Sequence, residues 1–554
     1  MVLAAIAVIL VVRLATLNTL AVTDNTEARH AEIGWQMFRS GDWVTPRFHL
    51  YGRLEPFLGK PPLSFWMTAL SFHVFGVSEW SSRLPNWLLG SAVIAMTVLF
   101  GRKLWSLHVG LLAALVLAST GLFFVLSGAC ILDMALAAAV SLAMMTFALF
   151  IADDAHAAWW GRAFFFALGL GCLAKGPVAV VLVGIALAAW LTIAHQWKSL
   201  CRLPWISGSA IAVVVTVPWF LLAERANPGF LRYFLINEHI LRYLVHDYGD
   251  RYGGGHTQPY GASWVMLAIA FLPWTPLLVR YAIETWRQRR TLTIDADNMW
   301  LAYAVIWGLT PALFFTLCRQ ILVTYVLPGF PGLALASAVV LSRWLQSDQR
   351  DALLRSVRFG AVLFAVTLIS GLAYGLLQPI SLWALAGLTA MVTLFVAMAW
   401  HGHKRNDAVT LLAAVGMGMP LLISVALSTG RGSINDTYSA KTIVARVTSL
   451  PERNRHPVVL PMGDEYSANF YVEACHDGRI TRHEERGASY VLQRVAQSPE
   501  EVFVFKRKHW ESLDPNVRRG LEPIVETGHW VACGISEEFP PAPALTLRLD
   551  NRPR

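Results

Sequence analysis

The sequence is poor in charged residues, because Asp, Glu, Lys and Arg together make up 15% of its 554 residues, against about 25% in soluble domains. Disorder and a coiled coil are therefore excluded. Its six cysteines have no metal-ligand spacing, and we see neither the internal repeats nor the mid-membrane acids of a typical transporter. Hydrophobic residues are abundant instead, at 55%, with 22 tryptophans and a mean hydropathy of +0.49. These values predict a polytopic α-helical membrane protein.

About thirteen apolar stretches approach the ~20 residues that a membrane-spanning helix needs. They lie near 1–22, 83–103, 108–128, 132–152, 159–174, 176–195, 205–223, 262–284, 299–317, 322–343, 357–376, 380–400 and 408–428. No small-residue cleavage pattern follows the first stretch, so we expect it to be retained as an anchor. We predict a transmembrane domain over 1–428, with long interfacial loops at 23–82 and 224–261, and a soluble domain over 429–554.

Basic residues gather in alternate short loops and indicate the topology. The formal net charge is +9, and in a membrane protein such an excess marks cytoplasmic loops and anionic lipid rather than nucleic acid. With an odd number of spans, this bias puts the amino terminus inside and both long loops and the tail outside. The loops concerned carry Arg102 and Lys103, Lys198 and Arg202, Arg287, Arg289 and Arg290, Arg350, Arg355 and Arg358, and Lys404 and Arg405.

The tail after Thr429 alternates between short strand-like and helix-like segments. The segments 457–461, 501–505 and 544–549 have the pattern of buried strands, so we predict a small α/β domain. Cys475 and Cys533 both lie in it, on the oxidising side of the predicted topology. Two cysteines carry no spacing signature, so a disulfide and free thiols stay open as alternatives.

The first long loop combines two helix signals with a lysine. Residues 27–38 have amphipathic spacing, with apolar positions on one side and Glu27 and Glu32 on the other, which predicts a helix in the interface plane. Lys60, followed by Pro61 and Pro62, predicts the start of a second interfacial helix. The alternative is a solvated connector with a snorkelling lysine.

Three short external segments carry polar residues that plain hydrophobicity does not explain. Asp133 is close to the start of an apolar helix, where a carboxylate is costly and marks function, although a first-turn acid favoured by the helix dipole is the alternative. Lys175 occupies an external turn. Arg319 lies in another, with Tyr325 deeper, and suits bidentate phosphate binding. A hydrated turn lysine and a lipid-bound arginine are the alternative interpretations.

The second long loop contains Glu238 four residues before Arg242, which we interpret as a surface ion pair. It then carries His256 after a glycine run, and such a histidine is more often a loop residue than a metal ligand. Under the predicted topology the polar candidates share one external face. Acids beside several cations at a membrane surface suit chemistry on a phosphate-bearing lipid. These candidates are Glu27, Lys60, Asp133, Lys175, His256, Arg319 and Tyr325.

The motifs also resemble a known family. The segments 26–33, 40–43, 60–62, 238–243 and 324–328, together with Asp133 and the sequence Ala174-Lys175-Gly176-Pro177, resemble the polyprenyl-phosphate-dependent GT-C glycosyltransferases. Within these, they are most similar to the lipid A 4-amino-4-deoxy-L-arabinose transferases. The resemblance covers about residues 20–345. It implies thirteen membrane helices, a periplasmic tail domain, and inverting transfer of the sugar from undecaprenyl phosphate to lipid A phosphate in a bacterial inner membrane.

The resemblance also assigns roles residue by residue. Asp133 matches the acid at the catalytic mouth, Lys60 the loop lysine that engages phosphate, and Tyr325 the phosphate-proximal tyrosine. Glu27 lies in the first acidic motif, where relatives often have Asp-Glu and this chain has Thr26, so Glu27 acts alone or with Asp24. We predict Asp133 and Glu27 as catalytic residues, and a phosphate-binding set of Lys60, Lys175, Arg319 and Tyr325.

Two further questions stay open at this stage. Some relatives have Glu-Lys-Pro where this chain has Gly59-Lys60-Pro61, with Glu55 four residues before Gly59, and this departure argues against a metal contact shared with His256. Glu55 and His256 are the residues that would hold a Zn or Mg ion, and no other cofactor is predicted. The second question is the reaction. The alternatives to aminoarabinose transfer onto lipid A are transfer of another sugar to core oligosaccharide, O-antigen or protein, and transport of a lipid-linked sugar without bond formation.

Overall fold

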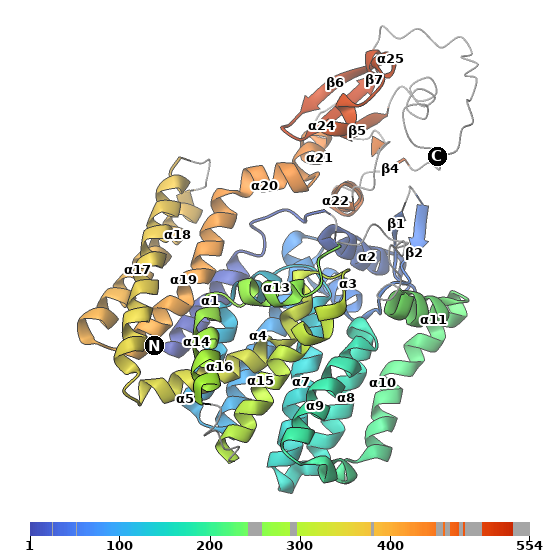
Figure 1. Cartoon of the computed structure of the whole chain (residues 1–554). Coiled ribbons are helices and arrows are strands. Elements are labelled where there is room, and N and C mark those ends of the chain that lie inside the picture. Colours follow the sequence, from blue (N-terminus) through green and yellow to red (C-terminus); the bar gives the residue numbers. More distant parts are fainter. Residues whose placement is uncertain are drawn as a thin grey trace. The chain divides into compact units, whose positions relative to one another are not determined.

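The computed structural model describes residues 1–24, 26–50, 53–241, 257–288, 296–377, 382–449, 458–459, 466–475, 480–481 and 501–535. His256, Arg242 and the predicted strand at 544–549 therefore lie outside the described residues. The chain forms two compact units (Figure 1). The first comprises Met1–Leu20, Met37–Pro46 and Pro56–Arg431, and the second comprises Ala21–Gln36, Arg47–Glu55 and Gly432–Arg554. We describe each unit by itself.

The first unit is built from helices. Its elements are α1 (Val2–Ala15), α3 (Leu63–Phe75), α4 (Glu79–Leu104), α5 (Leu107–Ser119), α6 (Gly121–Leu126), α7 (Asp133–Ala152), η1 (Asp154–His156), α8 (Ala157–Lys175), α9 (Val178–Ile193), η2 (Trp197–Arg202), α10 (Trp205–Ala226), α11 (Phe230–Arg232), η3 (Tyr233–Leu241), α13 (Ala262–Ala270), α14 (Thr275–Gln288), α15 (Ala296–Phe314), η4 (Phe315–Leu317), η5 (Val323–Gly329), α16 (Phe330–Leu345), α17 (Arg350–Gly375), α18 (Leu382–Arg405) and α19 (Ala408–Thr429).

These helices agree with the predicted number of spans. Among the described residues, nine helices are long and apolar enough to cross a membrane. The helices α13 and α14 are bent by 118° relative to each other, and they bring the number to ten if the bent pair is taken as one span. The shorter apolar helices α1, α5 and α9 occupy the three remaining predicted stretches. The prediction of an α-helical polytopic membrane protein with about thirteen helices is therefore confirmed.

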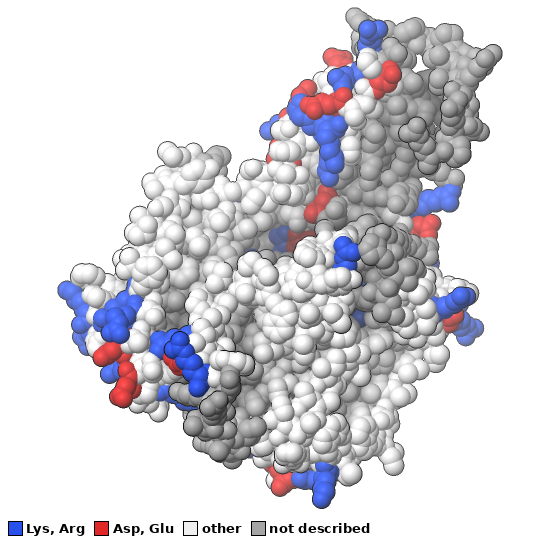
Figure 2. All heavy atoms as spheres, in the orientation of Figure 1, with Lys and Arg blue, Asp and Glu red and all other residues white. Residues whose placement is uncertain are grey.

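Small residues let the membrane helices pack closely. A Cβ atom at Gly101 of α4 would lie 2.6 Å from the Cα atom of Gly110 in α5, so the two backbones touch where only glycine fits. The alanine-rich helix α7 is almost wholly buried in this core. In Figure 2, Lys and Arg gather at a few places near the helix ends of the visible face, and most of its remaining described surface carries no charged atoms.

The helices predicted for the first long loop both form. α2 (Thr26–Ser40) covers the predicted 27–38 segment, and α3 begins directly after Pro61 and Pro62. The predicted polar side of α2 is not exposed, however, because Glu32 is fully buried. Its carboxylate accepts hydrogen bonds from the backbone N–H of His49, at 2.9 Å, and from the His49 ring. These hydrogen bonds take the place of the water that would solvate Glu32 if the helix lay at the membrane interface.

The second unit contains a five-stranded mixed sheet with the strand order β4-β3-β5-β7-β6. β4, β3 and β5 are parallel, and β7 runs antiparallel to both β5 and β6, so the prediction of a small α/β fold in the tail is confirmed. The elements are β1 (Arg47–Leu50), β2 (Arg53–Pro56), α20 (Arg431–Tyr438), α21 (Lys441–Thr448), β3 (Val458–Val459), α22 (Tyr466–Asn469), η6 (Phe470–Cys475), β4 (Ile480–Thr481), β5 (Val502–Lys506), α24 (Arg507–Glu511), α25 (Pro515–Arg519), β6 (Leu521–Glu526) and β7 (Trp530–Ile535).

Cys533 is a free, buried thiol on β7, in register with Phe503 of β5. The Cys475–Cys533 disulfide that the sequence left open is therefore not formed in this structure. Burial raises the pKa of the Cys533 thiol above its usual range, which keeps it protonated at neutral pH.

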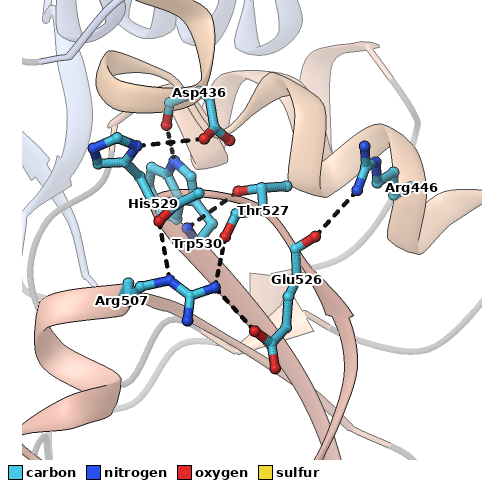
Figure 3. A network of polar contacts seen from close by, with 8 residues as sticks. Asp436, Arg446, Arg507, Glu526, Thr527, His529 and Trp530 are labelled. Carbon is cyan, nitrogen blue, oxygen red and sulfur yellow. Dashed lines mark hydrogen bonds and ion pairs between the residues drawn. The ribbon is translucent and has the colours of Figure 1, made fainter. Parts of the chain in front are cut away.

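Polar contacts connect the helices of the second unit to its sheet (Figure 3). The indole N–H of Trp530 donates to the carbonyl of Asp436 in α20, at 2.9 Å. The Arg507 guanidinium forms an ion pair with Glu526, at 2.9 Å, and donates to the Thr527 carbonyl, at 2.7 Å. These bonds attach the turn between β6 and β7 to both α20 and α24.

A segment of the first long loop also belongs to this unit. The backbone N–H of Val22 donates to the hydroxyl of Tyr471, at 2.7 Å. The carboxylate of Asp24 accepts from the backbone N–H and the hydroxyl of Ser467, at 2.7 and 2.8 Å. Two stretches of the loop, 21–36 and 47–55, are thereby grouped with the tail, which the sequence did not indicate.

Candidate functional site

Three of the predicted site residues meet inside the first unit. The Nζ atom of Lys175 lies 2.5 Å from Oδ1 of Asp133 and 4.1 Å from the centre of the Tyr325 ring. The side chains of Lys175 and Asp133 are only 12% and 11% exposed. A lysine is thus held between a carboxylate and an aromatic face, by an ion pair and a cation–π contact.

Local sequence places the acid and the lysine at helix ends. Asp133 is the first residue of α7. The side-chain amide of Asn86 in α4 fixes the preceding turn by donating to the Ile131 carbonyl, at 2.7 Å. Lys175 is the last residue of α8, which ends because Gly176 has a φ of +83° and Pro177 follows. Asp133 is therefore a first-turn acid, which was the alternative interpretation from the sequence, and it is also the partner of Lys175.

Tyr325 comes from a different part of the chain. It lies on η5, where its ring packs against Phe315 with 5.0 Å between ring centres. The residue is buried, so the aromatic face below Lys175 is fixed by packing rather than free to rotate into solvent.

A second carboxylate–lysine pair completes the cluster. Lys60 Nζ lies 2.8 Å from Glu238 Oε2 and also donates to the Gly59 carbonyl, at 2.7 Å. The Tyr233 hydroxyl donates to the other oxygen of Glu238, at 3.0 Å. The Glu238 side chain is only 5% exposed and that of Lys60 19%. The prediction of a surface position for Glu238 is therefore wrong, because this carboxylate is buried against a lysine of the first loop.

His239 contacts both pairs, because it follows Glu238 in the chain and its ring lies close to the backbone carbonyl of Lys175. One ring nitrogen, Nδ1, lies 2.7 Å from the Phe234 carbonyl oxygen, and the other, Nε2, lies 3.4 Å from the carbonyl oxygen of Lys175. Burial lowers the pKa of His239, which favours the neutral ring. A neutral imidazole carries a single N–H, so the shorter contact indicates that Nδ1 donates to Phe234.

Among the described residues, the cluster holds two lysines and two carboxylates, and each lysine is paired with one carboxylate. Four charges with little access to water need such pairing, because an unpaired buried charge costs several kcal/mol. An incoming anion therefore has to compete with the carboxylates for the two lysines.

Arg319 lies on the loop between η4 and η5, and it is half-buried. Its carbonyl accepts from the backbone N–H of Gln258, at 2.8 Å, and its guanidinium lies 5.8 Å from the centre of the Tyr260 ring. Thr257 and Gln320 form an isolated antiparallel bridge beside it. The described contacts of Arg319 thus tie the end of the second long loop to the segment that carries Tyr325.

The predicted residues Glu27 and Glu55 belong to the second unit. The Glu27 carboxylate accepts from the backbone N–H and the hydroxyl of Thr23, both at 3.2 Å, in the manner of a helix cap. Glu55 is half-buried on β2. The described residues contain no group of three or more His, Cys, Asp or Glu able to hold a metal ion. Because His256 lies outside them, the Glu55–His256 metal site stays a prediction.

Comparisons with known proteins agree with this architecture. Residues 1–234 match the model of the dolichyl-phosphate-mannose-protein mannosyltransferase family. The chain is 29% identical to the undecaprenyl phosphate-alpha-4-amino-4-deoxy-L-arabinose arabinosyl transferase of Pseudomonas aeruginosa over 408 residues, which are 70% of this chain and 69% of that protein. It is 30% identical over 353 residues to transferase 2 of the same name from Pseudomonas fluorescens, and the match spans 63% of this chain and 60% of that protein.

The sequence matches cover only part of the relatives, whereas the structural match covers nearly the whole chain. The chain spans 58% and 60% of the length of the two Pseudomonas fluorescens transferases that it matches. Among solved structures, it is similar to ArnT from Cupriavidus metallidurans bound to undecaprenyl phosphate, with a TM-score of 0.76 and 22% identity. That match covers 97% of this chain and 98% of the other. The first 234 residues of the chain are therefore similar to the dolichyl-phosphate-mannose-protein mannosyltransferase family, and the chain has the GT-C fold.

Proposed function

We propose that this protein transfers 4-amino-4-deoxy-L-arabinose from undecaprenyl phosphate to the phosphate groups of lipid A. The observation that carries the proposal is the buried Lys175–Asp133 pair packed on Tyr325, since all three residues match the transferase motifs. The names of the similar proteins support the same donor and sugar. We place the reaction on the periplasmic side of the bacterial inner membrane, with the amino terminus in the cytoplasm, because of the positive charge of the alternate loops.

In this proposal, residues 1–428 form the transferase domain and residues 429–554 a periplasmic domain. The contact between Asp24 and Ser467 supports a role for the tail in holding the first-loop segment that carries Glu27. Glu27, on that segment, is the second proposed catalytic residue.

The bond changes need no proton acceptor. An oxygen of the lipid A phosphate attacks the anomeric carbon of the sugar, and the bond from that carbon to the undecaprenyl phosphate oxygen breaks with inversion. A phosphate monoester loses its second proton near pH ~6, so the attacking oxygen is already anionic. The carrier phosphate leaves with the electron pair, and the charge that develops on it is what the site must stabilise.

The lysines supply that stabilisation by exchanging partners. When Lys175 turns from Asp133 to the carrier phosphate, it becomes a charge-assisted donor to the leaving group. The same exchange releases the Asp133 carboxylate, which then binds the cationic amino group of the sugar and orients it. Lys60 undergoes the parallel exchange from Glu238 to phosphate. Arg319 and Tyr325 complete the phosphate-binding set.

The test is turnover by the purified full chain, given undecaprenyl-phosphate-linked aminoarabinose and lipid A and followed by mass spectrometry of both lipids. Asp133→Asn should lower turnover at least ~100-fold, the scale expected when a transition-state contact is lost. The matched control is Asp154→Asn, because Asp154 is an exposed aspartate paired with Arg202. Near-normal turnover by Asp133→Asn would overturn the site assignment.

Two other outcomes separate the alternative functions. Consumption of the donor with lipid A unchanged would favour another acceptor. A donor whose sugar–phosphate bond stays intact, while vesicle-reconstituted protein moves it across the bilayer, would favour a transporter.

A further inference from the structure

A second concave site lies in the first unit, on residues that the proposed reaction does not use. It is a cavity of about 840 Å³ bounded by α14, α16, α17 and α19, within the ~300–1,000 Å³ range of ligand pockets. We call it the α14–α17 groove. Its lining includes Trp274 and Leu277 on one side, Gly360 and Leu363 on α17, and Met419 on α19.

The lining of the groove is mostly apolar, and it also contains two arginines. Arg280 of α14 and Arg355 of α17 are the charged residues of its lining. Arg280 is half-buried, stacks over the Trp344 ring at 4.4 Å, and forms an ion pair with Glu284 at 3.0 Å. Arg355 is exposed. Figure 2 shows basic side chains gathered in the region where α14 ends and α17 begins.

The groove lies at the break between α13 and α14. The two helices are bent by 118° relative to each other, and the break at Leu272 to Trp274 lines the groove. The break is fixed from the protein side, because the Trp274 indole donates to the Ser119 hydroxyl, at 2.8 Å. The backbone N–H of Gly121 also donates to the Leu272 carbonyl, at 3.0 Å. The α14–α17 groove is therefore formed by the backbone of the fold, and a change of side-chain rotamers does not close it.

We propose that the α14–α17 groove binds an anionic phospholipid, with its acyl chains along the apolar walls and its phosphate at Arg280 and Arg355. Lipid is the surrounding medium of these spans, and acyl chains are the ligand that such apolar walls accept. Basic pockets between transmembrane helices on the cytoplasmic side are sites for acidic lipid head groups.

The occupant would also support the proposed active site from a distance. α13, the other arm of the broken span, packs against η5, which carries Tyr325. The Ser263 hydroxyl on α13 donates to the Ala312 carbonyl of α15, at 2.8 Å. A lipid in the α14–α17 groove would stabilise the packing of α14 against α17. It would thereby stabilise the break between α13 and α14, and with it the position of α13.

The experiment is native mass spectrometry of the delipidated full chain, titrated with phosphatidylglycerol or with phosphatidylcholine of the same acyl chains. We expect one phosphatidylglycerol to be retained in preference to phosphatidylcholine. Each arginine near an anionic head group contributes about a fivefold change, so Arg280→Gln with Arg355→Gln should weaken phosphatidylglycerol binding by up to ~30-fold. Arg102→Gln, an exposed arginine at the end of α4 outside the groove, should leave binding unchanged.

A second variant tests the walls independently of charge. A Cβ atom at Gly360 would approach only Val415, at 3.8 Å, so Gly360→Phe fills the groove without a backbone clash. It should lower retention of both lipids while the double arginine variant lowers that of phosphatidylglycerol alone. Equal retention of both lipids by the unmodified chain, or full retention by the double variant, would overturn the proposal. Preferential retention of undecaprenyl phosphate, lost in the double variant, would replace the phospholipid by the carrier.

Discussion

Neutralising Glu238 tests the exchange of partners that the site requires. In the structure, Glu238 and Lys60 are 2.8 Å apart, and the carboxylate is 5% exposed. Removing one partner of a buried ion pair costs ~3–5 kcal/mol. Glu238→Gln should cost less, about 2–3 kcal/mol, because glutamine keeps an acceptor for Tyr233 and because Lys60 can turn toward solvent.

The same substitution should strengthen phosphate binding. In the unmodified protein an incoming phosphate must displace a carboxylate from Lys60, and it is repelled by that carboxylate afterwards. In Glu238→Gln the phosphate finds the lysine without an anionic competitor. We expect undecaprenyl phosphate to bind about tenfold more tightly, which corresponds to ~1.4 kcal/mol.

The assay is thermal unfolding of the purified full chain in detergent, titrated with undecaprenyl phosphate, since a ligand that binds only the folded state raises the unfolding temperature. Without ligand, Glu238→Gln should unfold at a lower temperature than the unmodified protein, but undecaprenyl phosphate should raise its unfolding temperature by more. In Lys60→Gln, most of that rise should be lost. Asp153→Asn is the matched control, because its carboxylate pairs with Lys103, at 3.2 Å, outside the site. Unchanged or weaker binding by folded Glu238→Gln would refute the exchange.

Two further predictions concern the elements that build the site. Gly176→Ala should destabilise the protein by about 1–3 kcal/mol, because φ is +83° and ψ is −153° in a region nearly confined to glycine; thermal unfolding beside Gly184→Ala, which meets nothing within 4 Å, checks this. Because burial lowers the folded-state pKa of His239, its contribution to stability is present above the unfolded pKa near ~6.5 and is lost as pH falls below it. The loss of stability from pH 7 to 5 should therefore shrink in His239→Gln, and an identical pH dependence in both proteins would contradict the burial argument.

Local pattern was sufficient to predict the membrane helices and part of the site. Hydrophobic runs decide which segments can cross a bilayer, and nine of the thirteen predicted stretches coincide with long apolar helices among the described residues. Asp133 and Lys175 were visible because each is a charge at an apolar helix end, and the structure joins them. Tyr325 came from the motif, and its buried ring lies beneath Lys175.

Residues whose partners are distant in sequence could not be predicted in this way. Glu238 has a neighbour four residues on, which favoured a surface pair, but its partner Lys60 is 178 residues away. The buried Glu32–His49 pair is similar, because the helix pattern puts Glu32 on a polar side. Periodicity describes one helix at a time, and tertiary packing decides which charges lose contact with water.

The most direct test of the account is lipid A mass spectrometry from a polymyxin-sensitive bacterial strain that lacks its own transferase and expresses this chain. We predict a mass increment matching aminoarabinose with the unmodified chain and none with Asp133→Asn, when both proteins are present in the membrane at equal levels. Unmodified lipid A in both strains, or an equal increment in both, would contradict the account.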